Sequence, residues 1–262
     1  MNIQIASDLH LEMREGHYPE IHDFYPVEDR DVLVLAGDIG TYVSAWPFIE
    51  EQLRRSPVIY VPGNHEYYCW QTRERVDRAW RRKAQQNRDL HYLIAEGVTL
   101  DGVRFWGAPW YSDLFGRRDR SFLRNVEYGI SDFSPRVSDF GRWTITRHLE
   151  EHARQTRLLR EQAGEVDVVI THWPPTLDAV APRFDGDPYN GCFVNDREGL
   201  VEAIGAQCWI SGHVHDAYRT IVGETLVIGN PAGYPREAPE SGLFRPDLAI
   251  EVEPLTSDEW ED

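Results

Sequence analysis

Cysteine is scarce in this sequence of 262 residues, which holds three: Cys69, Cys192 and Cys208. The three cysteines are far apart and form no CxxC pair, which excludes a disulfide framework or a zinc ribbon as the basis of the fold. Such usage is typical of a reducing compartment, so we expect a cytoplasmic location. No apolar run approaches the length of a membrane span, and the first residues carry no secretion signal, so we expect no membrane association.

Positive charge is also scarce. Lys and Arg number 27 against 44 Asp and Glu, which gives a formal net charge of −17. A strongly acidic protein repels nucleic acid at long range, so we expect a small molecule rather than nucleic acid as the partner. A basic cluster that could bind nucleic acid does occur. We interpret it instead as the solvated face of a helix, made by Arg73, Arg75, Arg78, Arg81, Arg82 and Lys83.

Repeats, low-complexity tracts and domain linkers are absent as well. A chain of this length suits one large α/β domain, so we predict a single domain over residues 1–262. Within it, residues 111–137 are irregular and rich in charge, and we interpret them as a cap or insertion over a site. The Pro-, Gly- and Asp-rich loop 174–195 is long enough to suggest a function. Residues 235–262 are predicted to form an acidic, loosely patterned tail.

Short apolar runs rich in β-branched residues predict strands at 3–6, 31–36, 58–61, 90–94, 98–100, 103–106, 166–170, 208–210, 220–222 and 225–228. Helices are predicted at 42–55, 70–87, 143–162 and 196–204. The pair Asp101-Gly102 is typical of a hairpin turn. Because strands alternate with helices first and hairpins follow later, we expect a mixed sheet, or two sheets, flanked by helices.

The residues that can carry chemistry fall in five short motifs, each after an apolar run. In chain order they are Asp8-Leu9-His10, Gly37-Asp38, Gly63-Asn64-His65-Glu66, Thr171-His172 and Gly212-His213-Val214-His215. Ligands of α/β sheets bind in the loops beyond the carboxyl ends of the strands, so these five loops can meet at one point. Each motif alone is weak evidence, but the five in this order predict a metal site.

The donor types indicate which metals the site would take. Besides Glu66, the motifs offer two carboxylates, one carboxamide and five imidazoles. Imidazole mixed with oxygen donors suits Mn, Fe, Zn, Ni or Co, whereas Ca and Mg prefer all-oxygen shells. The set can hold two divalent ions and leave one histidine as an acid. Two ions about 3.5–4 Å apart clamp both the attacking and the leaving oxygen of an in-line displacement, so we predict hydrolysis of phosphate esters.

The order D-x-H, G-D, G-N-H-[DE], a lone strand-end His and G-H-x-H resembles the motifs of the calcineurin-like metallophosphoesterase superfamily. The resemblance covers residues 8 to about 237. Three further segments are similar to those of a bacterial branch of that superfamily, namely 171–175, 181–188 and 229–234. The resemblance implies an α/β fold, a four-layer α/β/β/α sandwich with a dinuclear metal site at the C-terminal strand ends.

The resemblance also implies a role for each motif residue. The ligands of one ion would be Asp8, His10, Asp38 and His215. The ligands of the other would be Asp38, Asn64, His172 and His213, with Asp38 as the bridge between the ions. His65 would not bind metal but would act on the leaving group or the transition state. A hydroxide that bridges the ions would attack phosphorus, since no motif suggests a nucleophilic serine or cysteine.

The substrate is open at this point between a small phosphodiester and a phosphomonoester. We predict that Arg183 clamps its phosphate, because a guanidinium can grip two oxygens at once, and that Asn64 also contacts it. The alternatives are a metal-dependent nuclease, a mononuclear hydrolase and a protein-interaction scaffold that kept the fold and lost catalysis. The sequence favours a small-molecule hydrolase, because every motif residue is present and the net charge is negative.

The remaining residues near the motifs are given structural roles. His148 and His152, four residues apart on a predicted helix, are expected on its solvated face, while His17 and His22 could line the site. Glu66 is expected to cap a helix or to support the ligands. One aromatic set is interpreted as core, with a stacking surface for a base or aryl ester as the alternative: Tyr67, Tyr68, Trp70, Trp106, Trp110 and Tyr111.

Overall fold

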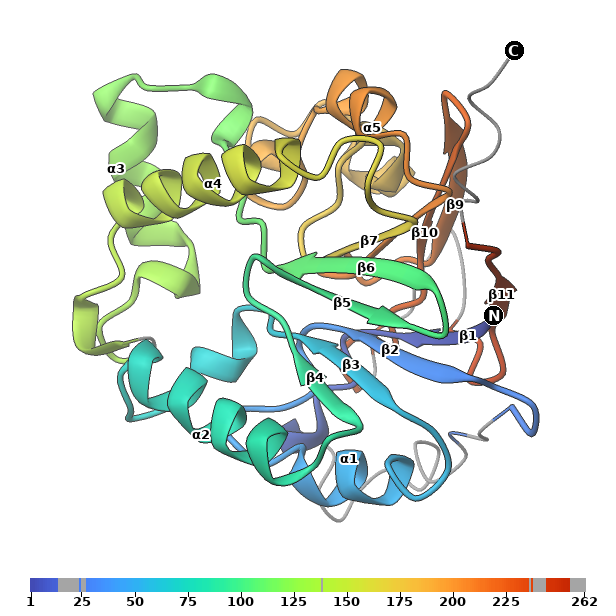
Figure 1. The fold of residues 1–262 in the computed structure, drawn as a ribbon. Helices are drawn as coiled ribbons and strands as arrows, with labels where there is room; N and C mark the ends of the chain where they lie inside the picture. The colour runs from blue at the N-terminus through green and yellow to red at the C-terminus, as the bar shows by residue number, and fades with distance from the viewer. Residues whose placement is uncertain (14–23, 25–26, 138, 236, 238–243, 255–262) are drawn as a thin grey trace.

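The computed structural model describes residues 1–13, 24, 27–137, 139–235, 237 and 244–254 (Figure 1). In this part of the chain, eleven strands form two sheets and five α-helices cover them. The two histidines expected near the site, His17 and His22, lie outside the described residues. None of the described helices is long and apolar enough to cross a membrane.

The first sheet has the strand order β11-β1-β2-β3-β4. Its strands are β1 (Asn2–Ala6), β2 (Val32–Ala36), β3 (Val58–Val61), β4 (Leu90–Tyr92) and β11 (Ala249–Glu251). Strands β1 to β4 run parallel, so their carboxyl ends share one edge, whereas β11 pairs antiparallel with β1. Every residue of β2 is buried, as expected for a continuous apolar run inside a parallel sheet.

The second sheet has the order β5-β6-β7-β8-β10-β9. Its strands are β5 (Glu96–Leu100), β6 (Val103–Ala108), β7 (Val168–Thr171), β8 (Cys208–Ser211), β9 (Tyr218–Val222) and β10 (Thr225–Gly229). The four inner strands run parallel, and β5 and β9 are added at the two edges by hairpins. Asp101 and Gly102 have φ angles of 45° and 86°, which fits the predicted tight turn.

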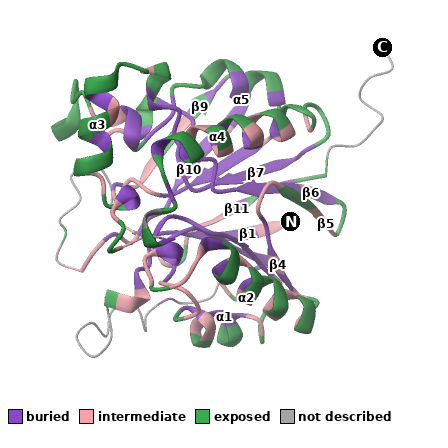
Figure 2. Ribbon diagram, turned by 90° about the vertical axis from the view of Figure 1, so that its left-hand side faces the viewer, coloured by how far each residue is buried: buried purple, intermediate pink, exposed green. Residues whose placement is uncertain are grey.

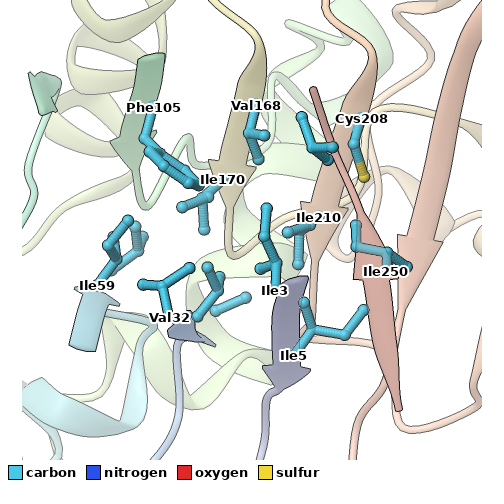
Figure 3. Packing of buried hydrophobic residues seen from close by; sticks show 14 of the residues in the cluster. Ile3, Ile5, Val32, Ile59, Phe105, Val168, Ile170, Cys208, Ile210 and Ile250 are labelled. Atoms are coloured by element: carbon cyan, nitrogen blue, oxygen red, sulfur yellow. The ribbon is translucent and has the colours of Figure 1, made fainter. Parts of the chain in front are cut away.

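The two sheets pack face to face around a common apolar core (Figure 3). Ile3, Ile5 and Val32 extend from the first sheet toward Val168 and Ile210 of the second. All of these side chains are fully or almost fully buried, and burial of each stabilises the fold by about 1.5–3 kcal/mol. This core fixes the two sheets relative to one another, and with them the loops at their carboxyl edges.

Helices cover the outer face of each sheet (Figures 1 and 2). On the first sheet, α1 (Trp46–Gln52) and α2 (Arg73–Gln86) bury Ile49 and Trp80 in a cluster with β2 and β3. On the second, α4 (Ile145–Arg160) and α5 (Glu198–Ile204) bury Leu159 and Val201 in a cluster with β7 and β8. The predicted four-layer α/β/β/α sandwich is therefore confirmed.

Some predicted elements are wrong in extent. The helix predicted at 42–55 is shorter, because Tyr42 has a φ angle of 50° and α1 begins only at Trp46, with Pro47 in its first turn. Residues 111–137, predicted to be irregular, contain α3 (Arg120–Gly129), whose N-terminus is capped by Asp119. The tail predicted from residue 235 contains β11, a strand too short to show a pattern.

Three residues predicted on solvated helix faces are buried instead, whereas the rest of the basic cluster on α2 is exposed or partly exposed as predicted. His148 and His152 are buried rather than solvated, because the segment around α3 covers a second face of α4. Arg73 is buried as well, with its guanidinium 4.1 Å from the ring of Tyr67 and 3.7 Å from that of Trp143. Stacking on two aromatic rings lets this charge lie inside the protein.

The aromatic set interpreted as core is buried in large part. The members with almost no exposed surface are Tyr67, Trp106, Trp110 and Tyr111. Trp70 is an exception, because 69% of its surface is exposed. Tyr68 lines a cavity, as described below.

Candidate metal centre

The five motifs converge at the carboxyl edges of the two sheets. They follow β1, β2 and β3, which are neighbours in the first sheet, and β7 and β8, which are neighbours in the second. Backbone hydrogen bonds join the loops: the Asp8 amide donates to Gly37, the His10 amide to Asp38, and the Gly212 amide to His172. The amides of His65 and His213 donate to the carboxylates of Asp38 and Asp8, at 2.8 and 3.1 Å, so hydrogen bonds connect all five motif loops.

One group of donors, the first donor cluster, consists of Asp8, His10 and His215. Its possible ligand atoms all lie within 4.8 Å of one another. The Nε2 atoms of His10 and His215 are 3.3 Å apart, and Nε2 of His215 is 3.6 Å from Oδ1 of Asp8. One ion can therefore contact all three side chains.

A second group, the second donor cluster, consists of Asp38, Asn64, His172 and His213. Nε2 of His172 lies 3.1 Å from Oδ1 of Asn64, 3.3 Å from Oδ2 of Asp38 and 3.2 Å from Nδ1 of His213. Asp38 also shares a possible ligand group with His10 of the first donor cluster. The structure thus brings all seven predicted ligands together, with Asp38 beside both clusters.

The chemistry of the second donor cluster fits a cation. Nδ1 of His172 donates to the carbonyl of Ala36 at 2.8 Å, so in neutral His172 the lone pair of Nε2 points toward the cluster. The Asn64 amide group donates to Asp132 at 2.9 Å, which turns its oxygen toward the same point. Electron-rich atoms then face one another without a proton between them. A divalent ion satisfies this arrangement, and these donor types suit Mn, Fe, Zn, Ni or Co.

The electrostatics of the donor side chains agree with this. Burial would raise the pKa of Asp38, but His172 and His65 hold that pKa well below its usual range. Burial lowers the pKa of His172, and the charges of Asp38 and Asp8 more than offset it and raise the pKa to about 10. Without a metal, a proton on His172 balances the buried carboxylates. A bound cation would take over this role and release protons.

The backbone supports the convergence at some conformational cost. Four of the predicted ligands have positive φ angles, namely Asp8, His10, Asp38 and His213. Such angles are unusual outside glycine and concentrate at functional sites. The motif glycines leave room for the donors: a Cβ at Gly63 would lie 2.6 Å from Nε2 of His172, and a Cβ at Gly212 would lie 2.6 Å from Oδ2 of Asp8.

His65, the predicted acid, is buried between the clusters and a tyrosine. Its Nδ1 is 3.1 Å from Oε1 of Glu12 and its Nε2 is 2.9 Å from the hydroxyl of Tyr234. Burial lowers the pKa of His65, but the charges of Asp38 and Glu12 outweigh it and raise the pKa to about 9. His65 is therefore placed to hold a proton. Its ring also forms a possible ligand group with His10 and Asp38.

Residues 1–217 match the model of the family described as calcineurin-like phosphoesterase. The chain belongs to this family. Membership supports metal-dependent hydrolysis of phosphate esters in general. The match contains the five motifs and most of the second sheet.

Two relatives carry little functional information in their names. An uncharacterised protein of Acanthamoeba polyphaga mimivirus is 22% identical, and the alignment covers 98% of each chain. A UPF0046 protein of Caenorhabditis elegans is 28% identical over 73% of this chain and 59% of its own length.

Two solved structures share the fold. A phosphopantetheinyl hydrolase from Mycobacterium tuberculosis has a TM-score of 0.67 and 19% identity, with 90% of each chain covered. A dimetal phosphatase from Danio rerio has a TM-score of 0.53 and 16% identity, with 87% of this chain and 86% of that one covered. At these identities, the likeness concerns the fold alone.

In this calcineurin-like phosphoesterase, Glu66 supports the site as expected from the sequence. Its buried carboxylate accepts from the backbone amides of Gly63 at 2.7 Å and Ile39 at 2.8 Å, and from the hydroxyl of Tyr60 at 2.6 Å. The loops after β2 and β3 are therefore tied together, which fixes Asp38 relative to Asn64.

Three carboxylates at the site were missed from the sequence. Glu12 contacts His65 and the Nδ1 atom of His10, at 3.4 Å. Asp132 accepts from Asn64, and Glu237 lies 2.5 Å from Nδ1 of His215. Such partners orient the side chains that bind metals and raise their basicity. Glu12 lies two residues after a motif, but no pattern in the sequence marks the other two.

Arg183, the predicted phosphate clamp, lies on the wall of a cavity that opens onto the site. Its guanidinium is paired with both carboxylate oxygens of Asp216, with Nη1 3.0 Å from Oδ1. Asp216 directly follows the last motif, so this pair attaches the loop around Arg183 to the metal centre. A contact between Arg183 and substrate stays a prediction.

Proposed function

We propose that this protein hydrolyses a small phosphate ester, either a diester or a monoester, with two divalent ions held by the two donor clusters. The observation that carries the proposal is the convergence of carboxylate, amide and imidazole donors around Asp38 and His172, next to His65, whose pKa is raised to about 9. Asp8, His10, Asp38 and His215 would hold one ion, and Asp38, Asn64, His172 and His213 the other.

The two ions, when bound, supply the Lewis acidity that polarises the phosphoryl group and ionises water near neutral pH. The protein's own residues do the rest. Asp38 fixes the two donor clusters relative to one another. His65, with Glu12 at Nδ1, can present the proton on Nε2 to the oxygen of the leaving group. The hydroxyl of Tyr234 lies on that side of His65 and can orient either the ring or the substrate.

The physical setting favours a small substrate. The negative charge of the chain opposes a long polyanion, so nucleic acid is not the proposed substrate. Mn, Fe, Zn, Ni or Co would suit the donors. The cytoplasmic location stays a prediction from cysteine usage.

The test is hydrolysis of bis-p-nitrophenyl phosphate and p-nitrophenyl phosphate by chelated and then Mn-reloaded protein, with metal content measured on the same samples. We expect turnover that returns with Mn at about two ions per chain. The ratio of the two rates then separates diesterase from monoesterase. Protein that binds no metal and shows no turnover would contradict the proposal and favour an interaction scaffold.

A further inference from the structure

A cavity of about 530 Å³ opens directly onto the metal centre. At one end it is lined by Asp38, Asn64 and His213, which belong to the second donor cluster. Its other walls come from residues 129–132, at the end of α3, and from the loop 180–193. A cavity of this size accommodates a small organic molecule. A phosphate bound at the metals would therefore leave room for the group esterified to it.

One wall of this cavity is apolar and accessible. Phe184 and Phe193 are 47% and 40% exposed, and both line the cavity. The Phe193 ring stacks on the ring of His213, with centroids 5.6 Å apart at an angle of 24°. The apolar surface therefore begins right beside the donors. Accessible aromatic rings grouped in a concave surface indicate a binding site for apolar groups.

The charges of the wall oppose an anion. Beyond the donors, the cavity is lined by four carboxylates, those of Asp132, Asp187, Asp216 and Glu237. Among the described residues that line it, Arg183 is the one Lys or Arg, and its guanidinium is engaged by Asp216. A second phosphate or carboxylate on the ligand would therefore meet like charge, and the described lining offers it no further Lys or Arg.

The same carboxylates do not indicate a cationic ligand either. Asp132 accepts hydrogen bonds from Asn64, Asp216 is paired with Arg183, and Glu237 contacts His215. Three of the four are thus already satisfied by the protein, and Asp187 lies at the exposed part of the wall. The wall suits an uncharged group that can cover the two phenylalanine rings.

We propose that this cavity binds the organic group of the phosphate ester, and that it selects an uncharged, largely apolar group over one that carries a second anion. The selectivity rests on the proposed function, because the phosphate at the metal centre positions the rest of the ligand. Phe184 and Phe193 are the residues that determine it.

The test is a matched pair of ligands that differ in charge at one end. Hexylphosphonate and 5-carboxypentylphosphonate have chains of similar length, and their binding to Mn-loaded protein is measured by calorimetry. We expect hexylphosphonate to bind at least about tenfold more tightly, as apolar burial and charge repulsion both favour it. A Phe184→Ala, Phe193→Ala double variant should lose most of this preference. Ile221→Ala, which changes an exposed apolar residue of β9 outside the cavity lining, should keep it.

Hydrolysis distinguishes this inference from the proposed function. Phosphate release from hexyl phosphate and 5-carboxypentyl phosphate should show the same preference in kcat/KM. A binding preference without any turnover, here and with the nitrophenyl esters, would support the cavity assignment and overturn the hydrolytic function. Equal or tighter binding of 5-carboxypentylphosphonate would overturn the cavity assignment. If that binding then weakened in Arg183→Gln, Arg183 would be shown to leave Asp216 and bind the carboxylate. An unchanged preference for hexylphosphonate in the Phe184→Ala, Phe193→Ala double variant would also overturn the cavity assignment.

Discussion

The two donor clusters differ in how the protein supports them. Both clusters are buried except for one partly exposed histidine each, His213 and His215, but the partner of His172 in the second donor cluster is a backbone carbonyl within β2. In the first, the side chain of His215 is 14% exposed and its partner is Glu237, a half-exposed side chain in a loop. Rigid, buried supports hold a ligand in place better than surface loops do. We therefore expect the second donor cluster to hold its ion more tightly.

The largest expected effect comes from the residue that both clusters share. Asp38→Asn removes one negative charge beside both proposed ions. Metal content should fall from about two to one or fewer per chain, and kcat should fall by at least about 10³-fold, since metal catalysis supplies several kcal/mol. Metal analysis and steady-state kinetics measure both. Asp101→Asn, in the hairpin between β5 and β6, is the control, because an Asn-Gly pair suits that turn equally. Retention of two ions would contradict the bridging role.

His65→Ala separates the acid from the ligands. We expect it to keep both ions and to lose about 10²–10⁴-fold in kcat on esters with poor leaving groups, and much less on nitrophenyl esters, whose leaving group needs no proton. Rates are compared for alkyl and nitrophenyl esters of the same phosphate. If the variant loses an ion instead, His65 is a ligand and the assignment of the acid is wrong.

The difference between the clusters can be measured through their carboxylate partners. Asp132→Asn should weaken the ion at the second donor cluster, and Glu237→Gln the ion at the first, each by about 10–100-fold. Competition with a chromophoric chelator gives the two affinities. The Asp132→Asn, Glu237→Gln double variant would show whether the two losses of metal affinity are independent. If both single changes weaken the same ion, the assignment of partners to clusters fails.

The smallest expected effect lies away from the metals, in the contact between α4 and the α3 segment. Burial and the nearby charge of Arg73 lower the pKa of His148 from 6.5 to about 3. Because the folded-state pKa lies below the unfolded value, the neutral histidine contributes its full stability above about pH 6.5 and loses it as the pH falls toward about 3. His148→Gln should therefore lose less stability than the native protein between about pH 7 and about pH 5. Urea unfolding at the two pH values measures this, and equal losses would show that folding does not lower the pKa of His148.

Much of the site could be predicted because its donors lie in contiguous motifs at strand ends. Parallel strands such as β1 and β2 necessarily bring Asp8 and Asp38 to one edge of a sheet. The supporting carboxylates Asp132 and Glu237 come from loops, and nothing local in the sequence says where such a side chain will lie. His148 was misplaced for a related reason. Helical spacing separates the apolar from the polar face of a helix. It does not show that a further segment, here the one around α3, also covers the polar face of α4.

The cavity wall was only partly visible in the sequence. The composition of residues 111–137 suggested a cap. The helix α3 within them was not predicted, because the many charged residues obscure the four-residue spacing of Phe122 and Val126, which are buried on one face of α3. The loop 174–195 was singled out for its length, and it does reach the site. That Arg183 would be paired with Asp216 depends on the packing of two loops far apart in the chain.

The most direct test of the account is anomalous diffraction from crystals of the Mn-loaded protein. We predict two peaks, one among Asp8, His10 and His215 and one among Asn64, His172 and His213, with Asp38 in contact with both ions and His65 in contact with neither. A single peak, or an ion bound by His65, would contradict the dinuclear centre described here.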